Sequence, residues 1–185
     1  ITIETLSGIK KLKAYTSGGK VNRLRVDMGK AILEPKEIPV VLDGDKVVDR
    51  PVEIAGKNYN ITCVSMGNPH CVVFMDDIDN LDIETIGPEF ENDKLFPERV
   101  NTEFVTVLDD HTIKMRVWER GSGETWACGT GACAVAVAAC ENGFCKKGED
   151  IKIKLKGGDL IINYTDETVY MTGNAEKVFE GEVEV

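Results

Sequence analysis

The chain has 185 residues, with 22 Lys or Arg against 32 Asp or Glu, and a formal net charge of −10. This acidic balance, without a basic cluster, argues against nucleic acid and anionic membrane surfaces as partners. A composition of 42% hydrophobic and 29% charged residues is typical of a globular protein. The longest apolar run, 132–140, is far shorter than the ~20 residues that span a bilayer. We expect a cytoplasmic protein of one large domain or two small ones.

Alternating apolar and polar residues predict strands through most of the chain. The first three, at 1–6, 12–16 and 23–28, are separated by glycine-containing turns and form an antiparallel meander. Further strands are expected at 46–54, 59–66, 71–75, 103–108, 112–119, 151–155, 160–164, 168–172 and 175–183.

Two segments favour helices. The segment 82–95 has Asp82 as a candidate N-cap, although Gly87-Pro88 should interrupt it. The segment 132–141 carries small apolar side chains on every face, and Asn142-Gly143 suits its C-terminal end. A helix without a polar face must be buried all round, so the sequence predicts an α+β fold with a sheet wrapped about this helix.

The chemistry-bearing segment is the glycine-rich loop 121–131, which places Cys128 just before a helix N-terminus. Unpaired N–H groups and the positive end of the helix dipole favour anions there. They should lower the pKa of the thiol and could hold a carboxylate beside it. Cys128 is therefore either a nucleophile or acid–base group, or a small buried hydrophobe.

The other cysteines, Cys63, Cys71, Cys133, Cys140 and Cys145, are expected to be structural. The chain has no CxxC pair, so we expect reduced thiols and no metal site. The run 129–134 also satisfies G-x-G-x-x-A, but it does not directly follow a strand, and no acidic residue ends the next one. A dinucleotide site is therefore disfavoured.

A second polar group surrounds His70, which lies in a turn between two apolar strands. A histidine there either moves charge near neutral pH or has a structural role. Glu119 and Arg120 are either a clamp for ammonium and carboxylate groups or an ordinary ion pair at a strand end.

These residues resemble the C-terminal part of the diaminopimelate epimerase family, whose members are cofactor-independent amino-acid isomerases of lysine biosynthesis. The resemblance extends across essentially the whole chain. Its motifs are 66–71 (MGNPHC), 96–101 (FPERVN), 116–125 (RVWERGSGET), 127–132 (ACGTGA) and 170–173 (YMTG).

The resemblance implies a two-cysteine mechanism that interconverts LL- and meso-diaminopimelate without a cofactor. Cys128 is one of the two cysteines, and the Gly129 and Thr130 amides hold the reacting carboxylate. The far end of the substrate is recognised by Asn68, Asn101, Glu119 and Arg120. His70, with Glu119, tunes the thiols.

The family fold has two lobes, each a mainly antiparallel sheet curled about a central helix. The resemblance implies that 29–173 is the complete C-terminal lobe, and that 1–28 with 174–185 belongs to the other lobe. The family's second cysteine lies in a Cys-Gly-Asn-Gly motif that this sequence lacks. We expect the chain to be a fragment that is inactive alone.

Two alternatives remain open. One is a related racemase or isomerase of the same fold, acting on proline, hydroxyproline or histidine or in phenazine synthesis. The other is a non-catalytic lobe that binds a carboxylate. The expected partner is a small amino-acid substrate, and a homodimer is compatible with the sequence.

Overall fold

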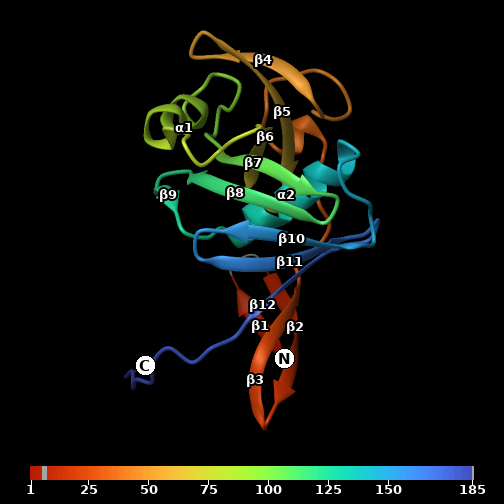
Figure 1. Cartoon of the computed structure of the whole chain (residues 1–185), viewed down its shortest axis with the longest axis vertical. Helices are drawn as coiled ribbons and strands as arrows, with labels where there is room; N and C mark the ends of the chain where they lie inside the picture. The colour runs from red at the N-terminus through yellow and green to blue at the C-terminus, as the bar shows by residue number, and fades with distance from the viewer. Residues whose placement is uncertain (6–7, 185) are drawn as a thin grey trace.

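A computed structural model shows a sheet curled around one central helix, and it describes residues 1–5 and 8–184. Twelve strands are described, eleven of them in one continuous path, and both helices lie against this sheet (Figure 1). The predicted α+β class is confirmed.

The elements follow one another in this order: β1 (Thr2–Thr5), β2 (Gly8–Ser17), β3 (Lys20–Asp27), the 3-10 turn Pro35–Glu37, β4 (Arg50–Ile54), β5 (Lys57–Ser65), β6 (Pro69–Phe74), α1 (Ile83–Glu91), β7 (Asn101–Asp109), β8 (Thr112–Glu119), β9 (Gly123–Thr125), α2 (Gly129–Glu141), β10 (Asp150–Leu155), β11 (Gly158–Tyr164) and β12 (Val169–Asn174).

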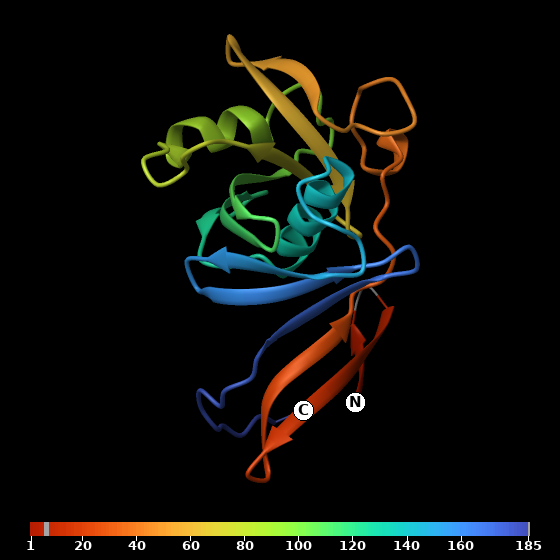
Figure 2. The same ribbon diagram turned by 45° about the vertical axis from the view of Figure 1, so that its right-hand side comes forward.

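The strand order along the sheet is β1-β2-β3-β12-β11-β10-β8-β7-β6-β5-β4, and β9 pairs with β8 at one side. β10 with β8 and β6 with β7 are parallel pairs. The other described ladders are antiparallel, as hairpins with short turns require. The sheet curls so that its concave face surrounds α2 (Figure 2).

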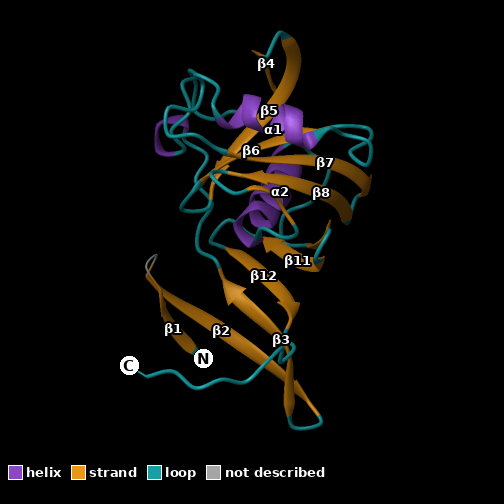
Figure 3. Cartoon of the chain, turned by 90° about the vertical axis from the view of Figure 1, so that its left-hand side faces the viewer, coloured by secondary structure: helices purple, strands orange, loops and turns teal. Residues whose placement is uncertain are grey.

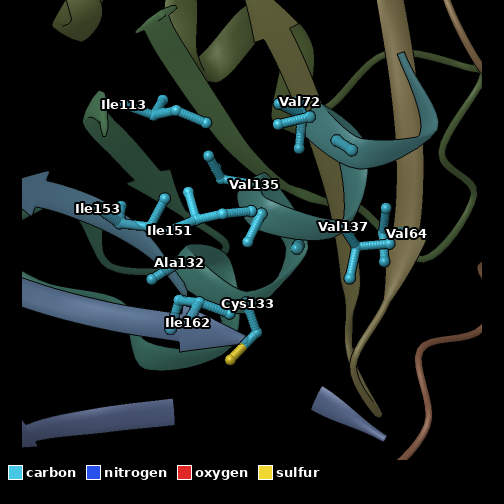
Figure 4. Close-up of a cluster of buried hydrophobic side chains, with 14 of the residues drawn as sticks. Val64, Val72, Ile113, Ala132, Cys133, Val135, Val137, Ile151, Ile153 and Ile162 are labelled. Atoms are coloured by element: carbon cyan, nitrogen blue, oxygen red, sulfur yellow. The ribbon is translucent and has the colours of Figure 1, made fainter. Parts of the chain in front are cut away.

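The helix α2 forms the main core. Every residue from Ala132 to Ala139 is wholly buried, which confirms the prediction of a helix without a polar face. Valines of β5 and β6 and isoleucines of β8, β10 and β11 surround it (Figure 4). The helix begins at Gly129, three residues earlier than predicted, with Cys128 as its N-cap. Glycine and threonine can occupy its first turn because that turn packs against the sheet.

A second core lies under α1. Phe90 of α1 stacks edge-on against Tyr59 and Phe104, with ring centroids 5.0 and 5.3 Å apart. Asp82 caps the helix, since its side chain accepts a hydrogen bond from the Thr85 N–H at 3.3 Å. The predicted interruption at Gly87-Pro88 is wrong: α1 continues through Pro88 and ends three residues later. Burial of the apolar face on both sides of the proline sustains the helix.

The strands β1, β2 and β3 form an arm that projects from the rest of the molecule (Figure 3). The arm is part of the same sheet because β3 pairs with β12. The first predicted strand reaches position 6, which lies outside the described residues. Within the described ranges, no helix has the length and apolar character needed to cross a membrane.

Two strand predictions are wrong. Residues 175–183 form no strand, and Val178 and Phe179 are 88% and 83% exposed, because among the described residues only Ala175 of this stretch bonds to a neighbouring backbone, at Asn22. Residues 46–49 are also irregular, since Asp49 has a φ of 47°, which breaks the extended conformation.

Candidate active site

The N-terminus of α2 places Cys128 at the centre of the candidate site. Cys128 has extended backbone dihedrals, and its Sγ accepts a hydrogen bond from the Gly131 N–H at 3.4 Å. The Thr130 hydroxyl lies 3.6 Å from the same sulfur. As the first residues of the helix, Gly129 and Thr130 have amide groups without intrahelical acceptors, so this end suits an anion.

Two glycines of this turn let other groups approach it closely. A Cβ on Gly131 would lie 2.6 Å from Glu103 Oε1 and 3.2 Å from Cys128 Sγ. A Cβ on Gly129 would lie 3.1 Å from the Met171 sulfur. Glycine is therefore required at position 131 to let β7 and its carboxylate approach the cysteine.

A chain of polar contacts leads from Cys128 into the sheet. Asn68 Nδ2 donates to Thr130 Oγ1 at 3.3 Å, and Asn68 Oδ1 lies 3.0 Å from His70 Nε2. His70 Nδ1 lies 2.7 Å from Glu103 Oε1, and both of these side chains are wholly buried. The structure thus brings together Asn68, His70, Cys128 and Thr130, all of which the sequence singled out.

Glu103 is the member of this chain that sequence reasoning missed. It lies on β7, and the parallel pairing of β6 with β7 brings it beside His70. Burial raises the pKa of its carboxyl, and the neighbouring His70 opposes that rise. A charged residue directly before the apolar pair Phe104-Val105 of β7 was the available signal.

The thiol of Cys128 differs from expectation. Burial, and then the charge of Glu103, raise its pKa to about 12, although the hydrogen bonds from Thr130 and Gly131 oppose this. The predicted lowering of this pKa is therefore wrong for the thiol in this environment. The sequence showed the helix terminus but not the burial or the carboxylate that outweigh it.

Asn101, at the start of β7, lies beside Glu119 and Arg120 at the end of β8. Asn101 Nδ2 donates to the Pro69 carbonyl at 2.8 Å, and its Oδ1 accepts from the Arg120 N–H at 2.9 Å, so this amide joins β6 to β8. Arg120 Nη1 donates to the Glu98 carbonyl at 2.9 Å. Glu119 accepts from the Thr125 hydroxyl and not from His70, whose carboxylate partner is Glu103.

The turn at 120–122, directly after β8, is held by a buried carboxylate. Glu91, at the end of α1, accepts from the Gly121 N–H at 2.9 Å and from Arg99 Nη1 at 3.0 Å with Oε1. Its Oε2 accepts from the Trp118 indole at 2.7 Å. Sequence reasoning missed Glu91 because its partners are distant along the chain.

Solved structures share this fold. A probable proline racemase from Agrobacterium radiobacter superposes with a TM-score of 0.70 at 15% identity, covering 94% of this chain and 57% of the racemase. The fold therefore belongs to the class of proline racemases and related epimerases.

The sequence comparisons are more specific. The family profile described as Diaminopimelate epimerase matches residues 62–178. A diaminopimelate epimerase from Acetivibrio thermocellus is 53% identical over 187 residues, and one from Methanococcus maripaludis is 49% identical over 187 residues. Both alignments cover 100% of this chain and 66% and 67% of those proteins, so the chain spans about two thirds of their length. The chain belongs to the diaminopimelate epimerase family.

Proposed function

We propose that the protein epimerises diaminopimelate between its LL and meso forms by acid–base chemistry at the α-carbon. Cys128 carries the proton on one face: as a thiolate it takes the α-proton, and as a thiol it returns one. Inversion needs a second group on the opposite face, which the family resemblance assigns to a cysteine of the motif that this sequence lacks. The observation that carries the proposal is the Cys128 thiol at the N-cap of α2, beside helix-terminal amides, in a chain of this family.

The reacting carboxylate would bind at the first turn of α2. The Gly129 and Thr130 N–H groups point out of the helix N-terminus within two residues of Cys128. When the α-proton leaves, negative charge spreads onto this carboxylate, and oriented donors stabilise that charge without reorganising. This is the electron-accepting role that a pyridoxal ring fills in other amino-acid racemases.

The far end of the substrate carries a second ammonium and a second carboxylate. Arg120 has further N–H donors besides the one bonded to Glu98, and these suit a carboxylate. Glu119 supplies the opposite charge one residue away. Asn68, bonded to Thr130 beside the cysteine, and Asn101, bonded to the Arg120 N–H, would share further contacts with the substrate.

The decisive test follows proton exchange in D2O. The full-length protein encoded by the gene is incubated with LL-diaminopimelate, and proton NMR follows loss of the α-proton signal and appearance of the meso form. We expect Cys128→Ala to abolish both. Cys140→Ala, at the far end of the same helix, is the matched control and should retain both.

The other outcomes separate the alternatives. Exchange with proline or histidine but not with diaminopimelate would identify a related racemase. Binding of diaminopimelate without exchange of its α-proton would leave a carboxylate-binding lobe. Retention of exchange in Cys128→Ala would overturn the role of Cys128.

A further inference from the structure

Glu103 is a buried acid whose hydrogen bonding is incomplete. Its side chain is wholly buried, and Oε1 meets His70 Nδ1 at 2.7 Å. Oε2 has no hydrogen-bond partner among the described residues, although it is shielded from solvent. A buried polar oxygen without a partner lowers the free energy of unfolding, so we expect Glu103 to have a role other than stabilising the fold.

The other oxygen of this carboxylate, the one bonded to His70, lies near the reacting sulfur. Glu103 Oε1 and Cys128 Sγ both approach the bare Cα of Gly131, where a side chain would meet both atoms. With little solvent to screen the interaction, negative charge on Glu103 disfavours a second negative charge on the sulfur.

We propose that Glu103 is a positioning residue that keeps Cys128 protonated at rest, so that Cys128 enters the reaction cycle as the proton donor. His70 holds the carboxylate in place, and the absence of a side chain at Gly131 lets it act on the thiol. The catalytic meaning rests on the proposed epimerase function, but the charge effect on the thiol does not.

The titratable groups around Cys128 come from several elements. Glu103 on β7 is the nearest acid, and Glu119 at the end of β8 adds a weaker repulsion. His70 on β6 faces Glu103, and Cys133 lies one turn further along α2. Because Glu119 repels negative charge on the sulfur less than Glu103 does, Glu103 should have the larger influence on the protonation of Cys128.

The experiment measures alkylation of each thiol by iodoacetamide between pH 7 and 10, in the full-length protein without substrate, by peptide mass spectrometry. In Glu103→Gln we expect Cys128 to react about tenfold faster than in the wild type at pH 8.5, equivalent to a fall of about one pKa unit. Cys133 is the internal reference, because loosened packing would expose both thiols whereas a charge effect speeds only Cys128.

Two variants complete the test. Glu141→Gln makes the same change at the far end of α2 and should leave Cys128 unchanged. Glu103→Asp retains the charge and should restore slow alkylation. Equal rates in Glu103→Gln and the wild type, or equal acceleration of Cys133, would overturn the proposal.

The wild type gives an independent check if Glu103→Gln does not fold. Its Cys128 alkylation rate should rise steadily with pH through pH 9, and a plateau at or below pH 8.5 would overturn the proposal. Since no turnover is measured, a protein that fails to epimerise diaminopimelate still reports on Glu103.

Discussion

The indole ring of Trp118 lies directly against the backbone of Gly87. A Cβ on Gly87 would fall 2.3 Å from Trp118 Cδ2, closer than any real contact. The same indole donates from Nε1 to Glu91, which ends α1. The helix is thereby fixed to the last residues of β8, and this strand ends at Glu119, next to Arg120.

We expect Gly87→Ala to lower the free energy of unfolding by about 1–3 kcal/mol, because the ring must move although alanine favours a helix. Urea denaturation measures the change. Gly181→Ala, in the exposed tail, is the control and should have no effect. A Gly87→Ala protein as stable as the wild type would contradict the close packing.

Glu91→Gln tests whether the Glu91 carboxylate holds the turn at 120–122 in place. The carboxylate accepts three hydrogen bonds, from Trp118, Gly121 and Arg99. An amide must place its NH2 toward one of these donors, which should cost about 1–3 kcal/mol of unfolding free energy. Because the turn positions Arg120, KM for diaminopimelate should also rise. Unchanged urea denaturation and an unchanged KM would show that the turn at 120–122 keeps its conformation without the Glu91 carboxylate.

How much the sequence could predict depends on how far apart the partners lie. Cys128, its helix and the helix-terminal amides are adjacent in the chain, so local patterns were sufficient. Glu103 meets His70 across 33 positions, and only the parallel register of β6 and β7 brings them together. No local pattern encodes that register.

The wrong prediction of a strand at 175–183 has a related cause. Alternation shows that a segment can form a strand, but a strand needs a neighbour with free backbone groups. Beyond Asn174 the chain leaves β3, and within the part of the chain that the structure describes only the Ala175 backbone still bonds to the arm. By contrast, the buried helix at 132–139 was predicted correctly because its composition allows no exposed face.

The buried thiols predict a fall in stability at alkaline pH. Burial raises the pKa of Cys133 to about 12, whereas a cysteine in the unfolded chain titrates near about 8.5. Between these values the unfolded state binds fewer protons than the folded state, so the free energy of unfolding falls as pH rises. Each such thiol contributes a slope of about 1.4 kcal/mol per pH unit.

Cys133→Ala removes one of the thiols that keep their proton in the folded state. Urea denaturation under reducing conditions at pH 7, 8, 9 and 10 should show a shallower fall above pH 9 in this variant than in the wild type. Below about pH 8 the two curves should run parallel, because the thiol is protonated in both states there. Identical slopes at pH 9 to 10 would mean that Cys133 is not protected in the folded state.

The 185-residue chain expressed alone should not convert LL-diaminopimelate into the meso form. Inversion requires groups on both faces of the carbon, and the Cys-Gly-Asn-Gly motif is absent from this sequence. The NMR assay in D2O, with the diaminopimelate epimerase of Acetivibrio thermocellus as the positive control, checks this. Measurable conversion to the meso form by the verified chain would show that the second cysteine is not needed.

Gly131→Ala tests the geometry between the cysteine and the carboxylate. Alanine is favoured over glycine within a helix by about 1 kcal/mol, so propensity alone predicts a more stable protein. The new methyl group would instead lie 2.6 Å from Glu103 Oε1 and 3.2 Å from Cys128 Sγ. Both are buried and cannot move freely, so the methyl group must displace the carboxylate or the thiol. We expect a loss of about 100-fold or more in kcat/KM, since misplacement of a reacting group by about 1 Å has such an effect.

Gly131→Ala also separates an effect on the position of the reacting groups from an effect on the stability of the fold. The change in unfolding free energy measured by urea denaturation should be small beside the loss in rate, because the helix gains part of what the contact loses. Thr130→Val, which removes the hydroxyl 3.6 Å from the sulfur but adds no group between Glu103 and Cys128, should reduce kcat/KM less. If Gly131→Ala retained wild-type kcat/KM, the approach of Glu103 to Cys128 would have no part in the reaction.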